Sequence, residues 1–450
     1  MTASNTYGDY DAIVIGGGFA GLTAARDLAD HSHSVLLLEA RDRLGGRTWT
    51  RPFADTDHMI EMGGQWIEPQ RQFNIVHEID RYGIRTSSSA EPHSRPTLLN
   101  GQRNPGPLPV PPEELIDLER AIFHMQKAAA RIQQGIPLDQ QGLHDLDVSW
   151  SDFLAPLNLP PATTEFLAAV TGLYAGRYPE EHSALGILSQ LAHLDLSVIM
   201  LWGVLDVRFT DGTKSLIDAM AADCPDIRLN APVASVSQDD TGVTVTTDDG
   251  GDVFTARTVM VATPVNMWSE IAFEPSLSEV KRQISADRHG TQTCGKFFAL
   301  ARGAQDYPYL LAGPRSTKGL MVYAQECDLP DGQLMIGFIC DPTNHDITTF
   351  EGVERALKTL DPDAELIKFD SHDWNTDPYS LGGWFSPRPG VLSKSQSELS
   401  RPEGRVLFAS SDVAISFQGW LEGAVETGHR AASTAMRTMA RDAAMAPVQR

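Results

Sequence analysis

Three glycines at the spacing G-x-G-x-x-G are the first residues whose types and positions indicate chemistry. Gly16, Gly18 and Gly21 follow a short apolar run, residues 12–15, and a helical pattern of apolar residues begins at Ala20. A strand that turns through glycines into a helix can bind phosphate, because the first N–H groups of the helix are free and its dipole is positive there. The first glycine permits the turn, the second a close backbone approach, and the third close packing of helix on strand.

A carboxylate stands where such a turn requires one. The apolar run of residues 35–38 is expected to form a second strand, and Glu39 follows it directly. A carboxylate at that strand end can accept hydrogen bonds from both hydroxyls of an adenosine ribose. Glycines scattered in ordinary turns would give the same spacing by chance. Strand, helix and Glu39 in register make a dinucleotide site the better interpretation.

The residues after Glu39 indicate whether the site binds a flavin or a nicotinamide cofactor. Residues 41–47 read RDRLGGR, a second glycine pair between arginines. Together with the first motif, this segment resembles the signature of the FAD-dependent amine oxidases, the monoamine oxidase family, in its soluble bacterial form. The resemblance implies that Glu39 binds ribose and that Arg41, Gly46 and Arg47 run beside the flavin diphosphate.

A third glycine pair lies in IEMGGQWIEP, residues 60–69. Glycine lets the backbone approach another group closely, and here the expected group is the flavin ring. In the resembled family this position is a flavin-contacting Gly-Gly followed by an aromatic residue, here Gly63, Gly64, Gln65 and Trp66. Amino-acid oxidases of the same superfamily usually carry an arginine near this point that grips the substrate carboxylate, so Gln65 favours a simple amine.

The C-terminal segment, residues 405–432, is a second match to the family. A helix is expected to begin near Gly419. Its N-terminus, at Trp420 and Leu421, would stabilise the negative charge that a flavin gains on reduction. The glycines of this segment could instead serve close helix packing alone.

Two departures from the family pattern bear on how FAD is held. The family commonly has Gly-Thr-Glu where this chain has Ser-Ser-Asp at residues 410–412, and Asp412 can still accept a ribityl hydroxyl. In the eukaryotic monoamine oxidases a cysteine carries the flavin thioether, and Gly383 stands in its place here. FAD is therefore expected to bind noncovalently. The backbone contact to adenine in the family corresponds to Val233.

Three residues are expected to take part in catalysis. The resemblance places Trp384 and Trp420 where the family sets an aromatic pair in front of the flavin, which steers the amine. Lys296, in the run CGKFFAL, matches the lysine that holds a water at flavin N5. A lysine inside an apolar, strand-like run is costly unless it is hydrogen-bonded, whereas a solvated surface lysine would need no such partner.

The order of elements predicts an α/β fold, here an α+β protein of two domains. A Rossmann-like FAD-binding domain is interleaved with a substrate-binding domain of helices and a mixed β-sheet. Residues 1–88, 206–285 and 395–450 are assigned to the FAD-binding domain, and residues 89–205 and 286–394 to the substrate-binding domain. Within them we expect a helical region at residues 161–205, strands at 296–300, 320–324, 334–340 and 404–409, and a final helix at 419–435.

Composition narrows the class of partners. The 450-residue chain has 36 Lys and Arg against 59 Asp and Glu, a net charge of −23, which disfavours nucleic acid and anionic membrane. The four cysteines are widely spaced, so neither a metal site nor a disulfide framework is expected. The N-terminal residues lack the pattern of a signal or transit peptide, and no apolar run has the length of a membrane span. A cytoplasmic protein without a membrane anchor is expected, and a homodimer is possible.

These observations predict the FAD-dependent oxidation of a small amine to the imine, which hydrolyses to an aldehyde or ketone. Hydride passes from the carbon next to nitrogen to flavin N5, and O₂, giving H₂O₂, or another acceptor reoxidises the flavin. The alternatives are an L-amino-acid oxidase, a desaturase, or a protein that binds FAD without catalysis. Gln65 counts against the first, and Lys296 with Trp384 and Trp420 against the last. The sequence leaves open which amine is oxidised.

Overall fold

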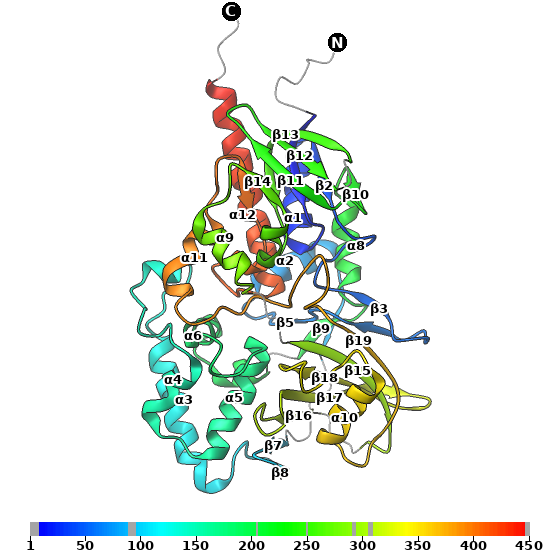
Figure 1. The fold of residues 1–450 in the computed structure, drawn as a ribbon, viewed down its shortest axis with the longest axis vertical. Coiled ribbons are helices and arrows are strands. Elements are labelled where there is room, and N and C mark those ends of the chain that lie inside the picture. The colour runs from blue at the N-terminus through cyan, green and yellow to red at the C-terminus, as the bar shows by residue number, and fades with distance from the viewer. Residues whose placement is uncertain are drawn as a thin grey trace, which may run out of the picture.

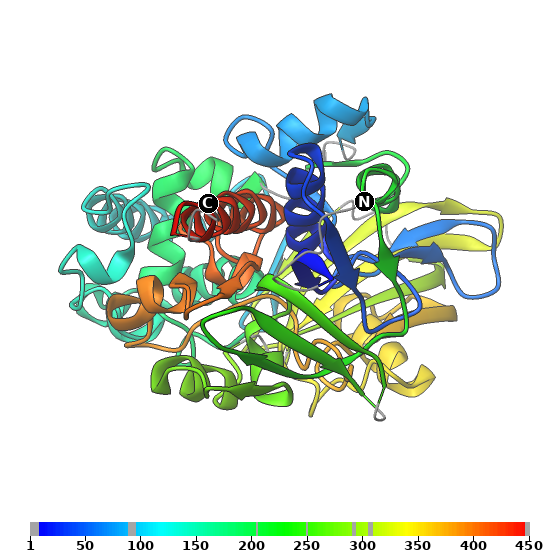
Figure 2. The same ribbon diagram turned by 90° about the horizontal axis from the view of Figure 1, so that it is seen from above.

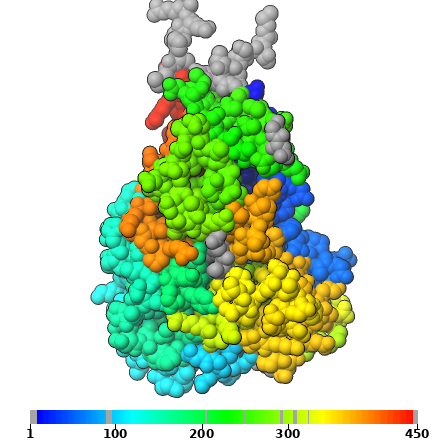
Figure 3. All heavy atoms as spheres, in the orientation of Figure 1, coloured from blue at the N-terminus to red at the C-terminus, as the bar shows by residue number. Residues whose placement is uncertain are grey.

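Two large sheets organise the computed structural model, one in the upper and one in the lower half of Figure 1. The structure describes residues 9–88, 96–203, 206–248, 251–289, 294–304 and 309–445. The predicted domain limits at 88/89 and 205/206 border segments 89–95 and 204–205, which lie outside the described residues. In the space-filling view of Figure 3, the green surface at the top lies above a cyan-to-green surface and a yellow surface, as the two halves of Figure 1 do.

The upper sheet has eight strands and contains the predicted dinucleotide unit. Its strands β1 and β2 are parallel and mostly buried, as expected for strands covered on both faces. Parallel pairing continues from β1 to β13 and from β13 to β20. In spatial order the strands are β10 (Ile227–Arg228), β2 (Val35–Leu38), β1 (Tyr10–Ile15), β13 (Val253–Val261), β12 (Val243–Thr247), β11 (Val233–Gln238) and β14 (Ala272–Glu274), with β20 (Val406–Phe408) beside β13.

The lower sheet has seven strands and is mixed. Antiparallel pairs join β19, β15, β18, β17 and β16, whereas β16 and β7 are parallel. Its strands are β19 (Glu365–His372), β15 (Gly295–Arg302), β18 (Gly332–Ile339), β17 (Leu320–Leu329), β16 (Tyr309–Ala312), β7 (Thr97–Leu99) and β8 (Gln102–Asn104). Short strands β3 (Thr50–Pro52) and β4 (Met59–Glu61) pair with each other, and β9 (Val207–Phe209) pairs with β5 (Trp66–Ile67) and β6 (Thr86–Ser88).

The predicted helical region at residues 161–205 divides into three helices. They are α5 (Pro161–Ala175), α6 (Ala184–His193) and α7 (Val198–Gly203). Gly176 ends α5 in a left-handed conformation, which is how the division arises. The remaining helices are α1 (Phe19–Asp30), α2 (Phe73–Tyr82), α3 (Leu115–Ala129), α4 (Trp150–Leu154), α8 (Lys214–Ala222), α9 (Glu279–Ala286), α10 (Phe350–Leu360), α11 (Leu392–Ser400) and α12 (Leu421–Met445).

The last helix, α12, differs from its predicted range at both ends. It begins at Leu421 rather than Gly419 and continues ten residues past the predicted end at Ala435. Met436 and Met439 pack into the same core cluster as the residues of β1 and α1, and this contact supports the additional turns. Figure 2 shows α12, in red, beside α1, in dark blue, so the first and last described helices pack against each other.

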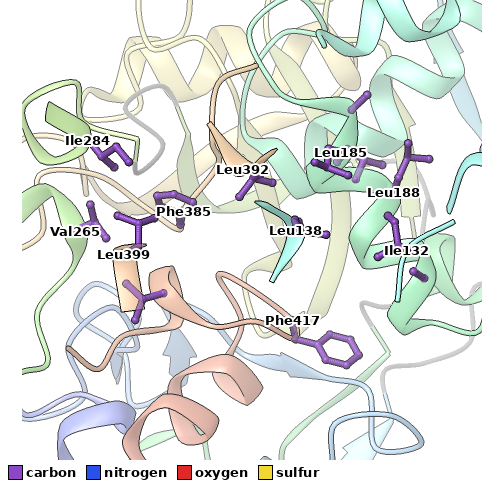
Figure 4. Close-up of a cluster of buried hydrophobic side chains, with 14 of the residues drawn as sticks. Ile132, Leu138, Leu185, Leu188, Val265, Ile284, Phe385, Leu392, Leu399 and Phe417 are labelled. Atoms are coloured by element: carbon purple, nitrogen blue, oxygen red, sulfur yellow. The ribbon is translucent and has the colours of Figure 1, made fainter. Parts of the chain in front are cut away.

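A buried cluster of apolar side chains joins segments from both halves of the molecule. Figure 4 shows members from the region after α3, from α6, from α9 and from α11, together with Phe385 and Phe417. Such a shared core holds the two halves together. The labelled members are Ile132, Leu138, Leu185, Leu188, Val265, Ile284, Phe385, Leu392, Leu399 and Phe417.

The fold class is confirmed: an α+β protein with a Rossmann-like sheet interleaved with a region of helices and a mixed sheet. All eight strands of the upper sheet come from residues 1–88, 206–285 and 395–450, and all seven of the lower sheet from 89–205 and 286–394. We propose these ranges as the domain division. Among the described helices, none is both long and apolar enough to cross a bilayer.

Candidate active site

A cavity of about 710 Å³ takes its lining from both halves of the protein. At one end lie the glycines that follow β1, and at the other end lie apolar residues of α5, α6 and α7. Lys296 on β15 and Trp420 at the start of α12 lie along the same cavity. The predicted dinucleotide site and the predicted substrate region are therefore continuous.

The turn after β1 has the geometry that its glycines predict. Gly16 has a φ of +106°, a conformation that L side chains rarely adopt. A Cβ on Gly21 would lie 1.9 Å from the carbonyl oxygen of Gly16, so helix and turn could not pack with any larger residue. At Gly18, the N-cap of α1, the nearest atom to a Cβ would be 3.8 Å away. The protein itself thus leaves room at Gly18, and no side chain caps α1, as a phosphate-binding helix end requires.

Glu39 is buried at the end of β2 and lines the cavity. Its carboxylate accepts backbone N–H bonds from Gly17 at 2.7 Å and from Arg41 at 2.9 Å. Each oxygen has a further lone pair, so the carboxylate can also accept two ribose hydroxyls. Val233, at the start of β11, lines the same end of the cavity.

The arginines of residues 41–47 hold the loop that faces the cavity. Arg43 donates to three carbonyl oxygens, those of Leu44, Gly46 and Thr48, at 3.0 to 3.1 Å. Burial lowers the pKa of Arg43 to about 10. Arg41 forms an ion pair with Asp377, and this pair joins the loop to the segment after β19.

Arg47 contacts residues far along the chain. It donates to the carbonyl oxygen of Gly383 at 2.8 Å, to Ser411 Oγ at 3.1 Å and to Asp412 Oδ1 at 2.7 Å. The other carboxylate oxygen of Asp412 accepts the backbone N–H of Val265. These contacts hold the loop of Arg47 against Gly383 and against the segment that follows β20.

Gly63 and Gly64 have different structural roles. A Cβ on Gly63 would lie 2.0 Å from the carbonyl oxygen of Arg47, so Gly63 is required by contact with the protein itself. A Cβ on Gly64 would have 3.9 Å to its nearest neighbours, Leu421 and Thr48. Gly64 faces open cavity, which fits the predicted approach of a flat ring.

Lys296 is buried, with 4% of its surface exposed, and its ammonium group is fully hydrogen-bonded. Nζ donates to the carbonyl oxygen of Glu61, to that of Gly63 at 3.0 Å and to Gln65 Oε1 at 2.7 Å. The rings of Trp66, Phe298 and Phe338 lie 5.2 to 5.6 Å from Nζ. Burial lowers the pKa of Lys296 to about 8, and nearby carboxylates, Glu61 first, oppose the shift.

Aromatic side chains in contact with one another form a wall of the cavity, called here the aromatic wall. Trp384 and Trp420 both line the cavity, and Trp384 Nε1 donates to the carbonyl oxygen of Tyr174 at 2.5 Å. The rings of Tyr174 and Trp420 are 5.9 Å apart and tilted by 48°. Tyr174 also donates its hydroxyl to the carbonyl oxygen of Leu201, so α5 and α7 are held to this wall.

Most of the sequence-predicted residues meet at this cavity. Gly21 and Asp412 do not line it: Gly21 packs against Gly16, and Asp412 lies behind Ser411. The predicted residues that do line it are Gly16, Gly18, Glu39, Arg41, Gly46, Arg47, Gly63, Gly64, Gln65, Trp66, Val233, Lys296, Trp384, Trp420 and Leu421.

Comparison with known proteins gives the family. The family model for flavin-containing amine oxidoreductases matches residues 19–436. This chain belongs to that family. An (S)-6-hydroxynicotine oxidase of Paenarthrobacter nicotinovorans is 35% identical over 95% of this chain and 100% of its own length. A pseudooxynicotine dehydrogenase of a Pseudomonas species is 31% identical over 93% of this chain and 85% of its own length. A solved putrescine oxidase variant is 26% identical with a TM-score of 0.83, covering 96% of this chain and 99% of its own.

As a flavin-containing amine oxidoreductase, the chain oxidises amines with FAD. The residues present fit this group: the uncapped start of α1 can take the diphosphate, Glu39 the ribose, and the open side of Gly64 a flat ring. The start of α12 faces Gly64 through Leu421. The positive end of a helix dipole at this point favours negative charge on the bound group.

Two residues of the amine oxidoreductase site have roles that the sequence did not show. Tyr174, in the helical region expected to supply cavity-lining residues, contacts both tryptophans, and Glu61 accepts the backbone N–H of Trp49 at 2.6 Å and of Thr213 at 3.2 Å. Glu61 thereby fixes the turn that supplies two of the carbonyl acceptors of Lys296. The helical pattern around Tyr174 predicts a packed side chain, and only tertiary contacts show these roles.

Proposed function

We propose that this amine oxidoreductase acts on amines that carry an aromatic or heteroaromatic ring. The supporting observation is the composition of the cavity beyond the tryptophan pair. The side chains that α5, α6, α7 and β18 contribute to its walls are mostly aromatic or aliphatic, and Ser189 and Gln190 of α6 are the polar members. The aromatic and aliphatic residues are Phe166, Val170, Leu173, Tyr174, Ile187, Leu201, Trp202 and Phe338. Rings pack well in such a chamber and gain stacking or edge contacts with its walls.

The carboxylates that line the cavity do not come from the helices of the apolar chamber. Among the described lining residues they are Glu39, Asp248 and Glu270, which follow β2, follow β12 and end the 3₁₀ turn Val265–Glu270. None belongs to α5, α6 or α7. A diamine would carry a second ammonium into the apolar chamber, and an unpaired buried charge is costly. The names of the two nicotine-related relatives agree with a ring-bearing substrate.

The chain's own residues are proposed to prepare the amine and place it. When bound, FAD supplies the two-electron acceptor for the hydride. Trp384 and Trp420 hold the amine nitrogen between flat π faces. An alkyl amine with a solution pKa near 10 is protonated at pH 7, and deprotonation costs about 4 kcal/mol. The apolar chamber lowers that cost because it disfavours the ammonium form.

Lys296 is proposed to supply positive charge beside the reacting groups. Its ammonium is the buried cation of β15 at this part of the cavity. A fixed positive charge in a low-dielectric site favours the negative charge that develops when O₂ is reduced. We therefore propose O₂ as the acceptor, with H₂O₂ as the product.

FAD is proposed to bind noncovalently. Gly383 lines the cavity where the family's thioether cysteine would stand, and glycine has no sulfur to form the bond. Acid precipitation of the holoprotein should release all of the yellow colour into the supernatant. Colour that stays with the precipitate would contradict noncovalent binding. The cytoplasmic location and the homodimer remain predictions.

The substrate proposal is tested by comparing amines on one enzyme preparation. Ring-bearing amines of the nicotine type should exceed putrescine in kcat/KM by a hundredfold or more, about 2.7 kcal/mol of transition-state stabilisation. The readouts are H₂O₂ formation and, in parallel, oxygen consumption. A higher kcat/KM for putrescine would contradict the proposed substrate class, and turnover with an artificial acceptor but not with O₂ would contradict the proposed acceptor.

A further inference from the structure

Two of the four cysteines lie on neighbouring strands of the lower sheet. Strands β15 and β18 are antiparallel, and Gly295 of β15 lies opposite Ile339 of β18. One residue further along the same register, Cys294 lies opposite Cys340. Both side chains are buried, with 3% and 1% of their surface exposed, and both thiols are free in this structure.

The backbone bonding of Cys340 defines the type of this cross-strand position. Its N–H donates to the carbonyl oxygen of Gly319, 2.7 Å away beside β17, on the far side of β18 from β15. Cys340 is therefore a non-hydrogen-bonded position toward β15, and opposite residues of this type have Cα atoms about 4.5 Å apart. A disulfide accepts Cα separations of about 4.4 to 6.8 Å. The two strands can thus accommodate a disulfide without a change of register.

Cys294 connects this pair to the cavity. Cys294 lines the cavity, whereas Cys340 is not among its described lining residues. Side chains two residues apart on a strand point to the same face, so Cys294 and Lys296 share one face of the chain at β15. The cavity is also where the proposed reduction of O₂ produces H₂O₂. A small oxidant therefore forms in a space that borders the thiol of Cys294.

Burial determines how fast the pair can react. It raises the pKa of the Cys294 thiol well above its usual range, the neighbouring Cys340 raises this pKa further, and Lys296 opposes the shift. Burial also raises the pKa of the Cys340 thiol. The thiolate is the nucleophilic form, so both thiols react slowly at neutral pH. Oxidation is then rare in a single catalytic cycle and accumulates over many turnovers.

We propose that Cys294 and Cys340 form an oxidation site, at which H₂O₂ made by the enzyme creates a disulfide that slows catalysis. The sulfur of Cys294 attacks one peroxide oxygen, the O–O bond breaks, and the other oxygen leaves as water. The sulfur of Cys340 then displaces the hydroxyl of the sulfenic acid as a second water. Two thiols lose two electrons and two protons, and one H₂O₂ becomes two waters. The source of the peroxide rests on the proposed function.

The disulfide should disturb the position of Lys296. The Cβ atoms of opposite residues are about 4.5 to 5.5 Å apart, and a disulfide brings them to about 3.8 Å. The end of β15 must then move toward β18, two residues from Lys296, which is hydrogen-bonded to residues 61–65. Because displacements of about 1 Å at a reacting site can cost a hundredfold in rate, we expect kcat/KM to fall by about tenfold. Dithiothreitol should restore it.

Added H₂O₂ tests the site without any amine. Holoenzyme is treated with H₂O₂, the excess is removed with catalase, and the remaining thiols are alkylated after denaturation. The wild type should lose two of its four thiols, and mass spectrometry should find one peptide pair joined through Cys294 and Cys340. Cys340→Ala should form no disulfide, and Cys340→Ser replaces it if the alanine variant does not fold. Cys327→Ala is the matched control, because Cys327 lies on β17 of the same sheet and its removal leaves the pair intact.

Turnover tests whether the enzyme's own peroxide is sufficient. While a ring-bearing amine is oxidised, the rates of the wild type and of Cys327→Ala should fall by about tenfold and recover with dithiothreitol, whereas Cys340→Ala should keep its initial rate. Any of four results would overturn the inference: four free thiols after H₂O₂ treatment, a disulfide between other cysteines, a Cys294–Cys340 disulfide that leaves kcat/KM unchanged, or equal decay in wild type and Cys340→Ala. An enzyme that no amine reduces would refute the proposed function, while the H₂O₂ treatment would still decide whether the pair is an oxidation site.

Discussion

Nη2 of Arg47 lies 2.7 Å from Oδ1 of Asp412, a residue 365 positions away in the sequence. Asp412 is 1% exposed, so its carboxylate depends on this partner for charge compensation. The pair connects the loop after β2 with the segment between β20 and α12, and both segments line the cavity. It therefore joins the first and last parts of the FAD-binding region.

Removal of Arg47 should destabilise this junction. Arg47→Met leaves the Asp412 carboxylate buried without its cation, and we expect a loss of about 2 to 3 kcal/mol in the free energy of unfolding. Asp412→Asn removes the charge that needs compensation, so Arg47→Met should cost much less in that background. Urea unfolding of the wild type, both single variants and the double variant measures the coupling. A coupling below about 0.5 kcal/mol would show that the two residues act independently.

Glu39 should determine FAD affinity. Glu39→Ala removes the charged acceptor for the ribose hydroxyls, worth about 1.5 to 3 kcal/mol, and FAD should bind about ten- to a hundredfold more weakly. Glu39→Gln keeps one acceptor oxygen and should lie between the alanine variant and the wild type. FAD titration of the apoprotein, followed by flavin fluorescence, gives the dissociation constants. Equal constants for the three proteins would refute the role of Glu39 as ribose ligand.

His429 on α12 forms ion pairs with two carboxylates of neighbouring helices. Nδ1 lies 2.6 Å from Asp27 of α1, and Nε2 lies 3.5 Å from Glu78 of α2. Arg26, which pairs with the same two carboxylates, adds a second cation to this network. Burial alone would lower the pKa of His429, but the two carboxylates outweigh it and raise the pKa to about 9.

This raised pKa predicts a pH-dependent stability. A folded-state pKa above the ordinary value of about 6.5 means that the stabilisation is complete below pH 6.5 and is lost as pH rises through about 9. The His429 side chain is one-third exposed, so solvent screens its ion pairs in part. We therefore expect protonated His429 to contribute about 1 to 2 kcal/mol to the free energy of unfolding. Urea unfolding at pH 6 and pH 10 should show that the free energy of unfolding falls more between these two pH values in the wild type than in His429→Gln. Equal losses in both proteins would exclude His429 as the source.

The dinucleotide turn could be predicted from sequence because its causes are local. Gly16 needs a positive φ and Gly21 lies against Gly16, and both requirements arise within a few residues of the turn. Glu39 could be placed for the same reason, since it directly follows a buried strand. The fold class followed from the order of such segments, and the family resemblance added the expected roles of residues distant in sequence.

Contacts between distant segments could not be predicted in the same way. Lys296 was expected to hold a water, and a partner was expected only because burial of a lysine requires one. The structure gives it three partners, Glu61 at the end of β4 and Gly63 and Gln65 in the turn that follows. The Arg47–Asp412 pair has the same origin, because the two residues were assigned separate roles at the flavin and only tertiary structure brings them together.

Lys296→Met should separate binding of FAD from reaction of the flavin. The substitution keeps a long apolar side chain and removes a charge, so FAD should stay bound. Loss of one preorganised charge typically costs on the order of a hundredfold in rate, and we expect this for flavin reoxidation or for both half-reactions. Stopped-flow measurement of both half-reactions gives the rates. Changes of less than about threefold, roughly 0.65 kcal/mol of barrier, would show that Lys296 has no part in the chemistry.

The central claim is that this protein oxidises amines with FAD, and anaerobic mixing of the holoenzyme with amines tests it most directly. A ring-bearing amine should bleach the visible flavin absorbance in a single exponential phase whose rate saturates with amine concentration. Admission of air should restore the absorbance and release one H₂O₂ per flavin reduced. A flavin that a chemical reductant bleaches but that no amine in a broad panel reduces would contradict the claim.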